Sequence, residues 1–178
     1  MTLELSGRLL LADPSLRDGF FNKSVILLGE HSPTDGAFGL VLNHPSGKTV
    51  GDVLPDAEFA PLARIPVHLG GPVSRDKLTF AAFWEKNSKL DFAVRISSEE
   101  AIAYLSQPGT MVRAFAGYSG WTENQLEHEL RQESWSVAKP SSSLLRLSHD
   151  ITLWKTLMYR LSPYHRILAD VPDEILTN

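Results

Sequence analysis

The sequence contains many short apolar runs bounded by Gly, Pro, Asp or Asn, and this pattern restricts the possible fold more than any other feature. Short runs rich in Val, Ile, Leu and Phe are typical of buried β-strands, whereas helices need longer periodic segments. The runs predict strands at Arg8–Ala12, Ser24–Glu30, Ala37–Asn43, Pro66–Gly70, Leu78–Phe83, Phe92–Ile96, Met111–Gly117 and Ser134–Ala138. We expect the turn residues of Pro33–Gly36 to fold the second strand back along the third as an antiparallel hairpin.

Three to four helices are predicted between and after these strands. Ser97 and Glu100 have the spacing of a capping box, which begins a helix, and Thr122 and Gln125 have the same spacing. The predicted helices cover residues 97–105, 122–132 and 150–161, with a fourth at 49–54. Hairpins between some strands and helices between others indicate an α+β fold with a mixed, largely antiparallel sheet.

Composition excludes several classes of protein. The chain of 178 residues has no cysteine, which excludes a disulfide scaffold, a thiolate zinc site and a cysteine nucleophile. Its length favours a single domain over residues 1–178. The formal net charge of −4, with no basic run, argues against direct nucleic-acid binding. No stretch is apolar enough to cross a bilayer and Met1–Arg8 lacks signal-peptide character, so a cytoplasmic location is expected.

The sequence Gly117-Tyr118-Ser119-Gly120 has some features of a serine nucleophile elbow, because a predicted strand precedes it and a predicted helix follows. The second glycine of the elbow is replaced by Trp121, however, so the turn is more simply explained by its glycines. The alternative to a binding domain is therefore a hydrolase or transferase that uses Ser119 or His44. The six histidines do not have metal-ligand spacing, so neither a metal nor a cofactor is predicted.

Several segments, taken in order, resemble one family of bacterial proteins. They include Gly39–Pro45, Leu69–Val73 and Gly117–Trp121, followed by Gln125 and Trp135. In this order they are similar to the AlgH/YqgE family over essentially the whole chain. The resemblance implies an irregular α+β fold with a partly open, barrel-like sheet. Family members are often labelled transcriptional regulators, without an established biochemical activity.

The chain departs from the pattern of that family at the segment Thr122–Asn124, which replaces a more glycine-rich turn, and at two single positions. His44 stands where the family usually has arginine, and Ser119 stands where it usually has alanine. The first change removes a permanent positive charge, and the second means that a serine nucleophile would be new in this chain.

Each of the three glycine-bearing segments follows a predicted strand, so their ends could meet at one edge of the sheet and line a cleft. The alternative is that the glycines only let the chain cross itself tightly. The cleft hypothesis predicts a binding or regulatory domain with a protein partner or a small-molecule ligand. The acidic side chains of the 122–132 helix could also meet a basic partner. The predicted ligand-binding residues are Asn43, His44, Gly70, Gly71, Pro72, Tyr118, Ser119, Trp121 and Gln125.

Overall fold

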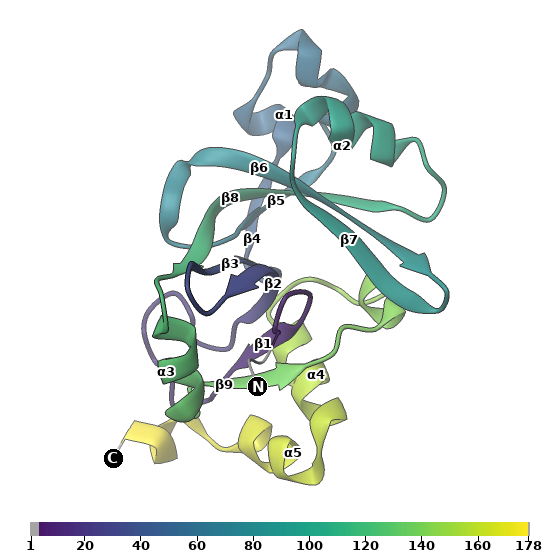
Figure 1. Cartoon of the computed structure of the whole chain (residues 1–178). Helices are drawn as coiled ribbons and strands as arrows, with labels where there is room; N and C mark the ends of the chain where they lie inside the picture. Colours follow the sequence, from purple (N-terminus) through teal and green to yellow (C-terminus); the bar gives the residue numbers. More distant parts are fainter. Residues whose placement is uncertain (1–3, 178) are drawn as a thin grey trace.

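The computed structural model describes residues 4–177, which form one mixed α+β arrangement around a curled, open half-barrel sheet (Figure 1). The strands are β1 (Leu9–Ala12), β2 (Val25–Ser32), β3 (Gly36–Val41), β4 (Pro45–Thr49), β5 (Pro66–Leu69), β6 (Val73–Lys86), β7 (Lys89–Ile96), β8 (Met111–Trp121) and β9 (Trp135–Ala138). The α-helices are α1 (Val50–Val53), α2 (Ser98–Leu105), α3 (Gln125–Arg131), α4 (Thr152–Leu161) and α5 (Pro163–Asp170). Short 3₁₀ helices, η1 (Ala57–Leu62), η2 (Ser142–Leu145) and η3 (Asp173–Thr177), complete the described chain.

The strand order is β4-β5-β8-β3-β2-β1-β9, and β6 also pairs with β8 and carries β7 on its other side. The pairs are antiparallel except for β5 with β8. The hairpin predicted around Pro33–Gly36 is confirmed, with Ser32 opposite Gly36. The sheet is thus mixed and largely antiparallel, as the alternation of hairpins and helices predicted.

Strand β1 shows why the apolar runs are continuous. All four of its residues are buried, and they alternate between two hydrophobic clusters. Leu9 and Leu11 join the cluster beneath α4, which also contains Trp154 and Met158, while Leu10 faces the cluster beneath α3. A strand covered on both faces cannot alternate with polar residues, so the run stays apolar. A third cluster lies beneath α1 and α2.

Several elements differ from the predictions, among them β6, which runs from Val73 to Lys86 where Leu78–Phe83 is predicted. The strand predicted at Met111–Gly117 continues to Trp121, so the expected turn there is the second half of β8. Strand β4 was missed because its Pro and Gly resemble a loop, although both are tolerated in an edge strand. The sequence does not predict α5, because Pro163 indicates only the end of the preceding helix. Pro163 also begins α5 at its first position, after the Ser162 cap.

Helix α3 is fixed to the sheet by one carboxylate. Glu129 accepts hydrogen bonds from the indole nitrogens of Trp121, at 2.9 Å, and Trp135, at 2.8 Å. Trp121 lies on β8 and Trp135 on β9, so a single side chain joins two distant strands through the helix. Both indoles are buried, and each N–H would otherwise lack an acceptor.

Two hydrogen bonds from buried histidines hold the segment that connects β9 to α4. His68 on β5 donates from Nε2 to the His149 carbonyl, and His149 donates from Nε2 to the Leu144 carbonyl, each at 2.9 Å. Burial is the main cause that lowers the pKa of both histidines, and the nearby Arg113 guanidinium adds to it. Both rings are therefore neutral in the folded protein at neutral pH.

We expect Glu129→Ala to destabilise the protein by about 2–4 kcal/mol, because two buried indole N–H groups lose a charged acceptor. Urea unfolding monitored by tryptophan fluorescence measures the loss. The matched control is Glu123→Ala at an exposed position near the same helix, which should change stability by less than about 0.5 kcal/mol. Equal effects of the two substitutions would contradict the stabilising role of the Glu129 hydrogen bonds to Trp121 and Trp135.

We expect stability to fall as the pH drops below 6.5, the ordinary pKa of histidine. Because the folded pKa values of His68 and His149 are lowered, the unfolded chain binds protons in this window that the folded chain does not. Urea unfolding between pH 7.5 and about 5 measures the slope. The slope should become shallower in His149→Gln and stay unchanged in His128→Gln, whose histidine is exposed. An unchanged slope in His149→Gln would refute the assignment.

Candidate functional site

The three glycine-bearing segments do come together in space. Leu69 donates its backbone N–H to the His44 carbonyl, and the Gly70 carbonyl accepts from the Val41 N–H. Gly70 in turn donates to the Ala116 carbonyl on β8. The segment after β3, the segment after β5 and the middle of β8 are therefore neighbours, as the cleft hypothesis required.

The three segments meet by close packing of their backbones, and we call this contact the joint. A Cβ atom built on Gly71 would lie 2.0 Å from the carbonyl atoms of Tyr118, and one on Gly117 would lie 2.4 Å from the Gly71 oxygen. Gly70 and Gly71 are buried, and the Gly70 amide is already hydrogen bonded within the sheet. The glycines here let two backbones approach, which is the alternative that the sequence left open.

Two of the predicted polar residues are used inside this joint. Asn43 is 3% exposed, accepts from the Val25 N–H and donates to the Lys23 carbonyl. Ser119 is fully buried and donates its hydroxyl to the Gly70 carbonyl. Among residues 4–177 no histidine is hydrogen bonded to Ser119, so the hydroxyl lacks the neighbouring base that a serine nucleophile needs.

The predicted aromatic residues face opposite sides of the sheet. Tyr118 packs against the cluster beneath α4, with its ring 5.3 Å from that of Phe38, whereas Trp121 belongs to the cluster beneath α3. Gln125 lies at the start of α3, where it accepts from Thr122 and donates to Glu129. These three predicted residues therefore do not line one common hollow.

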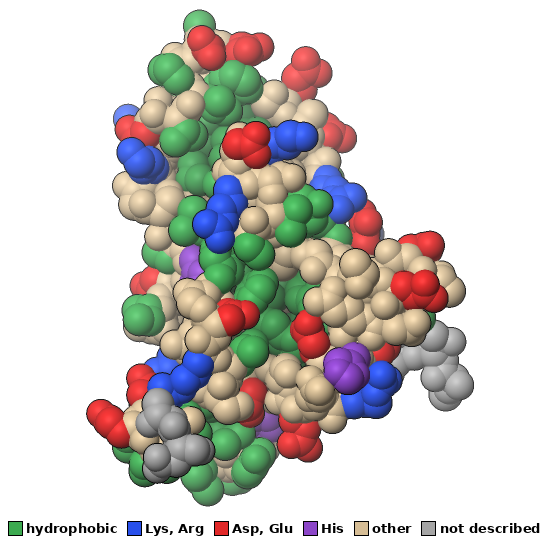
Figure 2. All heavy atoms as spheres, turned by 90° about the vertical axis from the view of Figure 1, so that its left-hand side faces the viewer, with side chains coloured by type: hydrophobic (Ala, Val, Ile, Leu, Met, Phe, Trp, Pro, Cys, Tyr) green, Lys and Arg blue, Asp and Glu red, His purple; other side chains and the backbone are tan. Residues whose placement is uncertain are grey.

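The remaining predicted residues lie near the surface. The His44 ring is 5.2 Å from that of Phe20, and its pKa is lowered by burial and by His68. Pro72 is exposed between the half-exposed side chains of Leu69 and Val73. Figure 2 shows hydrophobic side chains gathered along the middle of the face on which the start of β6 and α3 lie.

A hollow of about 350 Å³ is lined in part by Tyr118, and we call it the bulge hollow. The register of β6 shifts twice, once against β8 and once against β7, and these irregularities surround the hollow. Bulges turn side chains away from the regular pleat and are common beside functional sites. The bulge hollow is lined by Phe38, Ser74, Lys77, Leu78, Thr79, Arg95, Gly117 and Tyr118.

Three residues of the bulge hollow have left-handed backbone conformations. Ser74 has a φ of 50°, Arg95 a φ of 55° and Gly117 a φ of 73°. Only the glycine adopts this conformation without a steric cost, so Ser74 and Arg95 are held there by the surrounding sheet. Such strain concentrates at binding and catalytic sites.

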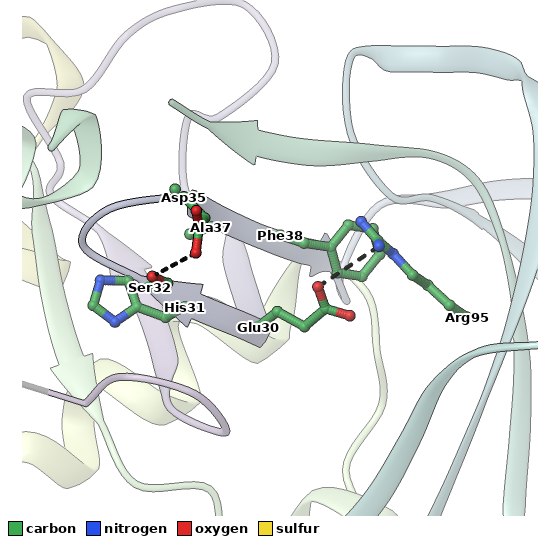
Figure 3. A pocket seen from close by; sticks show the side chains of 8 residues that line it. Glu30, His31, Ser32, Asp35, Ala37, Phe38 and Arg95 are labelled. Atoms are coloured by element: carbon green, nitrogen blue, oxygen red, sulfur yellow. Dashed lines mark hydrogen bonds and ion pairs between the residues drawn. The ribbon is translucent and has the colours of Figure 1, made fainter. Parts of the chain in front are cut away.

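Arg95 forms part of the wall of the bulge hollow, and Figure 3 shows it from the neighbouring pocket around Glu30 and Asp35. Its guanidinium reaches from β7 across to β3 and lies 3.7 Å from the centre of the Phe38 ring and 6.0 Å from that of Tyr118. Glu30 contacts the same guanidinium at 3.6 Å. The planar cation is thus stacked on an aromatic floor with its edge toward a carboxylate.

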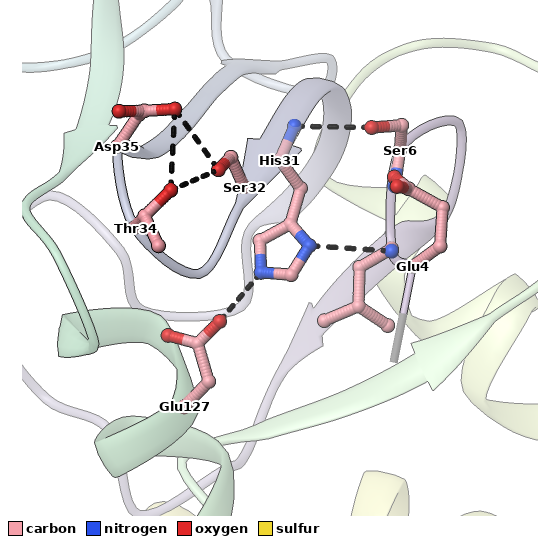
Figure 4. A network of polar contacts seen from close by, with 8 residues as sticks. Glu4, Ser6, His31, Ser32, Thr34, Asp35 and Glu127 are labelled. Atoms are coloured by element: carbon pink, nitrogen blue, oxygen red, sulfur yellow. Dashed lines mark hydrogen bonds and ion pairs between the residues drawn. The ribbon is translucent and has the colours of Figure 1, made fainter. Parts of the chain in front are cut away.

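A second hollow of about 280 Å³ lies on the other side of Phe38 and Arg95, and we call it the turn hollow. Its wall carries the acidic side chains Glu30 and Asp35 from the β2–β3 hairpin. Beside it, His31 accepts from the Leu5 N–H at Nδ1 and donates from Nε2 to Glu127, at 2.6 Å (Figure 4). The His31 ring is committed on both nitrogens, so it ties α3 to the hairpin.

The sequence drew attention to Tyr118 but not to Ser74, Lys77 or Arg95. A charged residue at the end of an apolar run resembles an ordinary solvent-facing strand position. The bulges that place these side chains together depend on pairing between strands far apart in the chain. The part of the chain that the structure describes contains no group of three or more His, Asp or Glu residues able to hold a metal ion. Within residues 4–177 no helix is both long and apolar enough to span a membrane.

The half-barrel fold and its bulged strands define a small α+β protein, and comparison with known proteins assigns its family. The AlgH-like family model matches residues 9–165, so the chain belongs to this family. A UPF0301 protein of Cytophaga hutchinsonii is 33% identical over 177 residues, covering 93% of this chain and 94% of its own length.

Two solved structures have the same fold. The AlgH protein of Pseudomonas aeruginosa superposes with a TM-score of 0.67 at 26% identity, over 97% of this chain and 96% of that one. A Corynebacterium diphtheriae protein superposes with a TM-score of 0.72 at 24% identity, over 96% of this chain and 94% of that one.

We expect Gly71→Ala to destabilise the protein by more than about 3 kcal/mol, because its Cβ would overlap the Tyr118 backbone, which cannot move aside. Gly19→Ala is the matched control, since a Cβ there meets nothing within 4 Å. It should change stability by less than about 1 kcal/mol. Thermal unfolding of both variants measures the difference, and a mild effect of Gly71→Ala would show that the joint is open.

Proposed function

We propose that this protein is a non-enzymatic binding domain that holds a small-molecule ligand in the bulge hollow. The observation that carries the proposal is the combination of two strained residues, Ser74 and Arg95, with a cation stacked on Phe38. Ligand sites typically have an aromatic lining with a few placed polar groups and volumes of a few hundred Å³ or more. Of the residues predicted from sequence, Tyr118 enters this proposal directly, and the buried joint holds it in place.

Any regulatory role would run through this ligand or a protein partner. The net charge of −4 opposes contact with nucleic-acid phosphates. Of the acidic side chains of residues 122–132, Glu127 and Glu129 are hydrogen bonded within the molecule. The hollow is therefore a better supported site than the α3 surface.

A thermal-shift screen against a metabolite panel tests the proposal. A ligand at 100 times its Kd adds about 2.7 kcal/mol of stability, which raises the Tm of a chain of this size by roughly 5–10 °C. The shift should be reduced in Lys77→Gln and retained in Lys86→Gln, which changes an exposed lysine at the far end of β6.

Two outcomes would contradict the proposal. One is a panel in which no stabilising compound shifts the backbone amides of Ser74, Lys77 and Tyr118 in ¹⁵N-labelled protein, because binding would then lie elsewhere. The other is chemical conversion of a stabilising compound during incubation, followed by NMR, because the protein would then be an enzyme.

A further inference from the structure

The charged side chains that line the bulge hollow are both basic. They are Lys77 and Arg95, and no acidic residue is among those that line it. Within residues 4–177, Lys77 forms no ion pair or side-chain hydrogen bond, and Arg95 has only the exposed Glu30 as an ion-pair partner. Lys77 therefore presents to the hollow a positive charge that the described chain does not neutralise, and this favours an anionic group.

Three of the residues that line the same hollow carry hydroxyl groups. They belong to Ser74, Thr79 and Tyr118, and none of them makes a side-chain hydrogen bond within the described chain. Hydroxyls can donate to carboxylate or phosphate oxygens, and together with the two cations they form a set of donors around one volume. A neutral apolar ligand would leave this set unused.

The aromatic side of the hollow favours a planar ligand. The guanidinium of Arg95 already lies against Phe38 on one face, and Tyr118 stands beside it with a partly exposed ring. Guanidinium and phenol faces both stack on planar rings. The volume of about 350 Å³ equals roughly a dozen water volumes, which suits a ligand of one or two rings.

The turn hollow sets the orientation. Glu30 and Asp35 lie there, on the far side of Phe38, so an anionic group is repelled from that side and attracted to Lys77. We propose, on the basis of the proposed function, that the ligand is a planar ring bearing a carboxylate or phosphate, with its ring beside Arg95 and Tyr118 and its anion at Lys77. A carboxylate and a phosphate share one chemistry here, since each places two or three anionic oxygens on a flat apolar ring.

Matched probes separate the charge from the ring. 2-Naphthoate and naphthyl phosphate carry both features, 2-naphthamide lacks the charge, cyclohexanecarboxylate lacks the planar ring, and inorganic phosphate is the anion alone. Each is titrated into ¹⁵N-labelled protein up to millimolar concentration. We expect 2-naphthoate or naphthyl phosphate to shift the amides of Ser74, Lys77 and Tyr118, and to bind at least about tenfold more tightly than 2-naphthamide.

Variants assign each feature to a residue. Lys77→Gln should weaken the anionic probes about tenfold and leave 2-naphthamide unchanged, while Lys86→Gln should change neither. Arg95→Lys keeps the charge but removes the planar stacking surface, so it should lower the preference for 2-naphthoate over cyclohexanecarboxylate.

The outcomes distinguish this inference from the proposed function. If 2-naphthamide binds at the same amides as tightly as 2-naphthoate, the anionic class is wrong and the hollow is still a binding site. Equal binding of cyclohexanecarboxylate, or binding of inorganic phosphate alone, overturns the planar class. If no probe shifts these amides although a compound from the thermal screen does, only this inference fails. If neither probes nor screened compounds act there, both fail.

Discussion

The whole arrangement depends on the close approach of two backbones at the middle of β8. The first part of this strand pairs with β5 and β6, and its last part pairs with β3. Between them Gly117 adopts a left-handed conformation. A Cβ atom built on Gly117 would lie only 2.4 Å from the Gly71 oxygen. One strand can serve both halves of the sheet only because no side chain occupies this crossing. The curl of the half-barrel follows from that change of direction.

The same crossing creates the candidate site. When β8 turns at Gly117, its partner β6 cannot stay in register, and the pairing shifts between Val73 and Leu78. The residues left out of the ladder include Ser74 and Lys77, which face the bulge hollow. A comparable shift of β6 against β7 lies beside Arg95. The polar lining is therefore a consequence of how the sheet bends, and the same bend holds the backbone of the lining residues in place.

These connections explain what the sequence could and could not predict. Residues such as Leu9–Ala12 identified strands because both of their faces are buried, and Ser97 with Glu100 identified α2 because a capping box is a local interaction. The neighbourhood of Gly70 and Gly117 was predicted from strand ends, whereas its packed character depends on atoms from three segments. The role of Arg95 could not be predicted from the sequence, because Arg95 and Phe38 are 57 positions apart and meet only where β6 and β7 shift register.

The state of Arg95 also determines how readily the site could accept a ligand. Its side chain is 49% exposed and that of Glu30 is 61% exposed, so solvent screens their ion pair strongly. The pair therefore cannot be the main reason that the guanidinium stays over Phe38. Stacking at 3.7 Å on a buried ring and the constrained backbone at φ 55° hold it more firmly. The ring of an incoming ligand can consequently lie beside the guanidinium without displacing the stacked arrangement, which leaves the wall of the hollow preformed for binding.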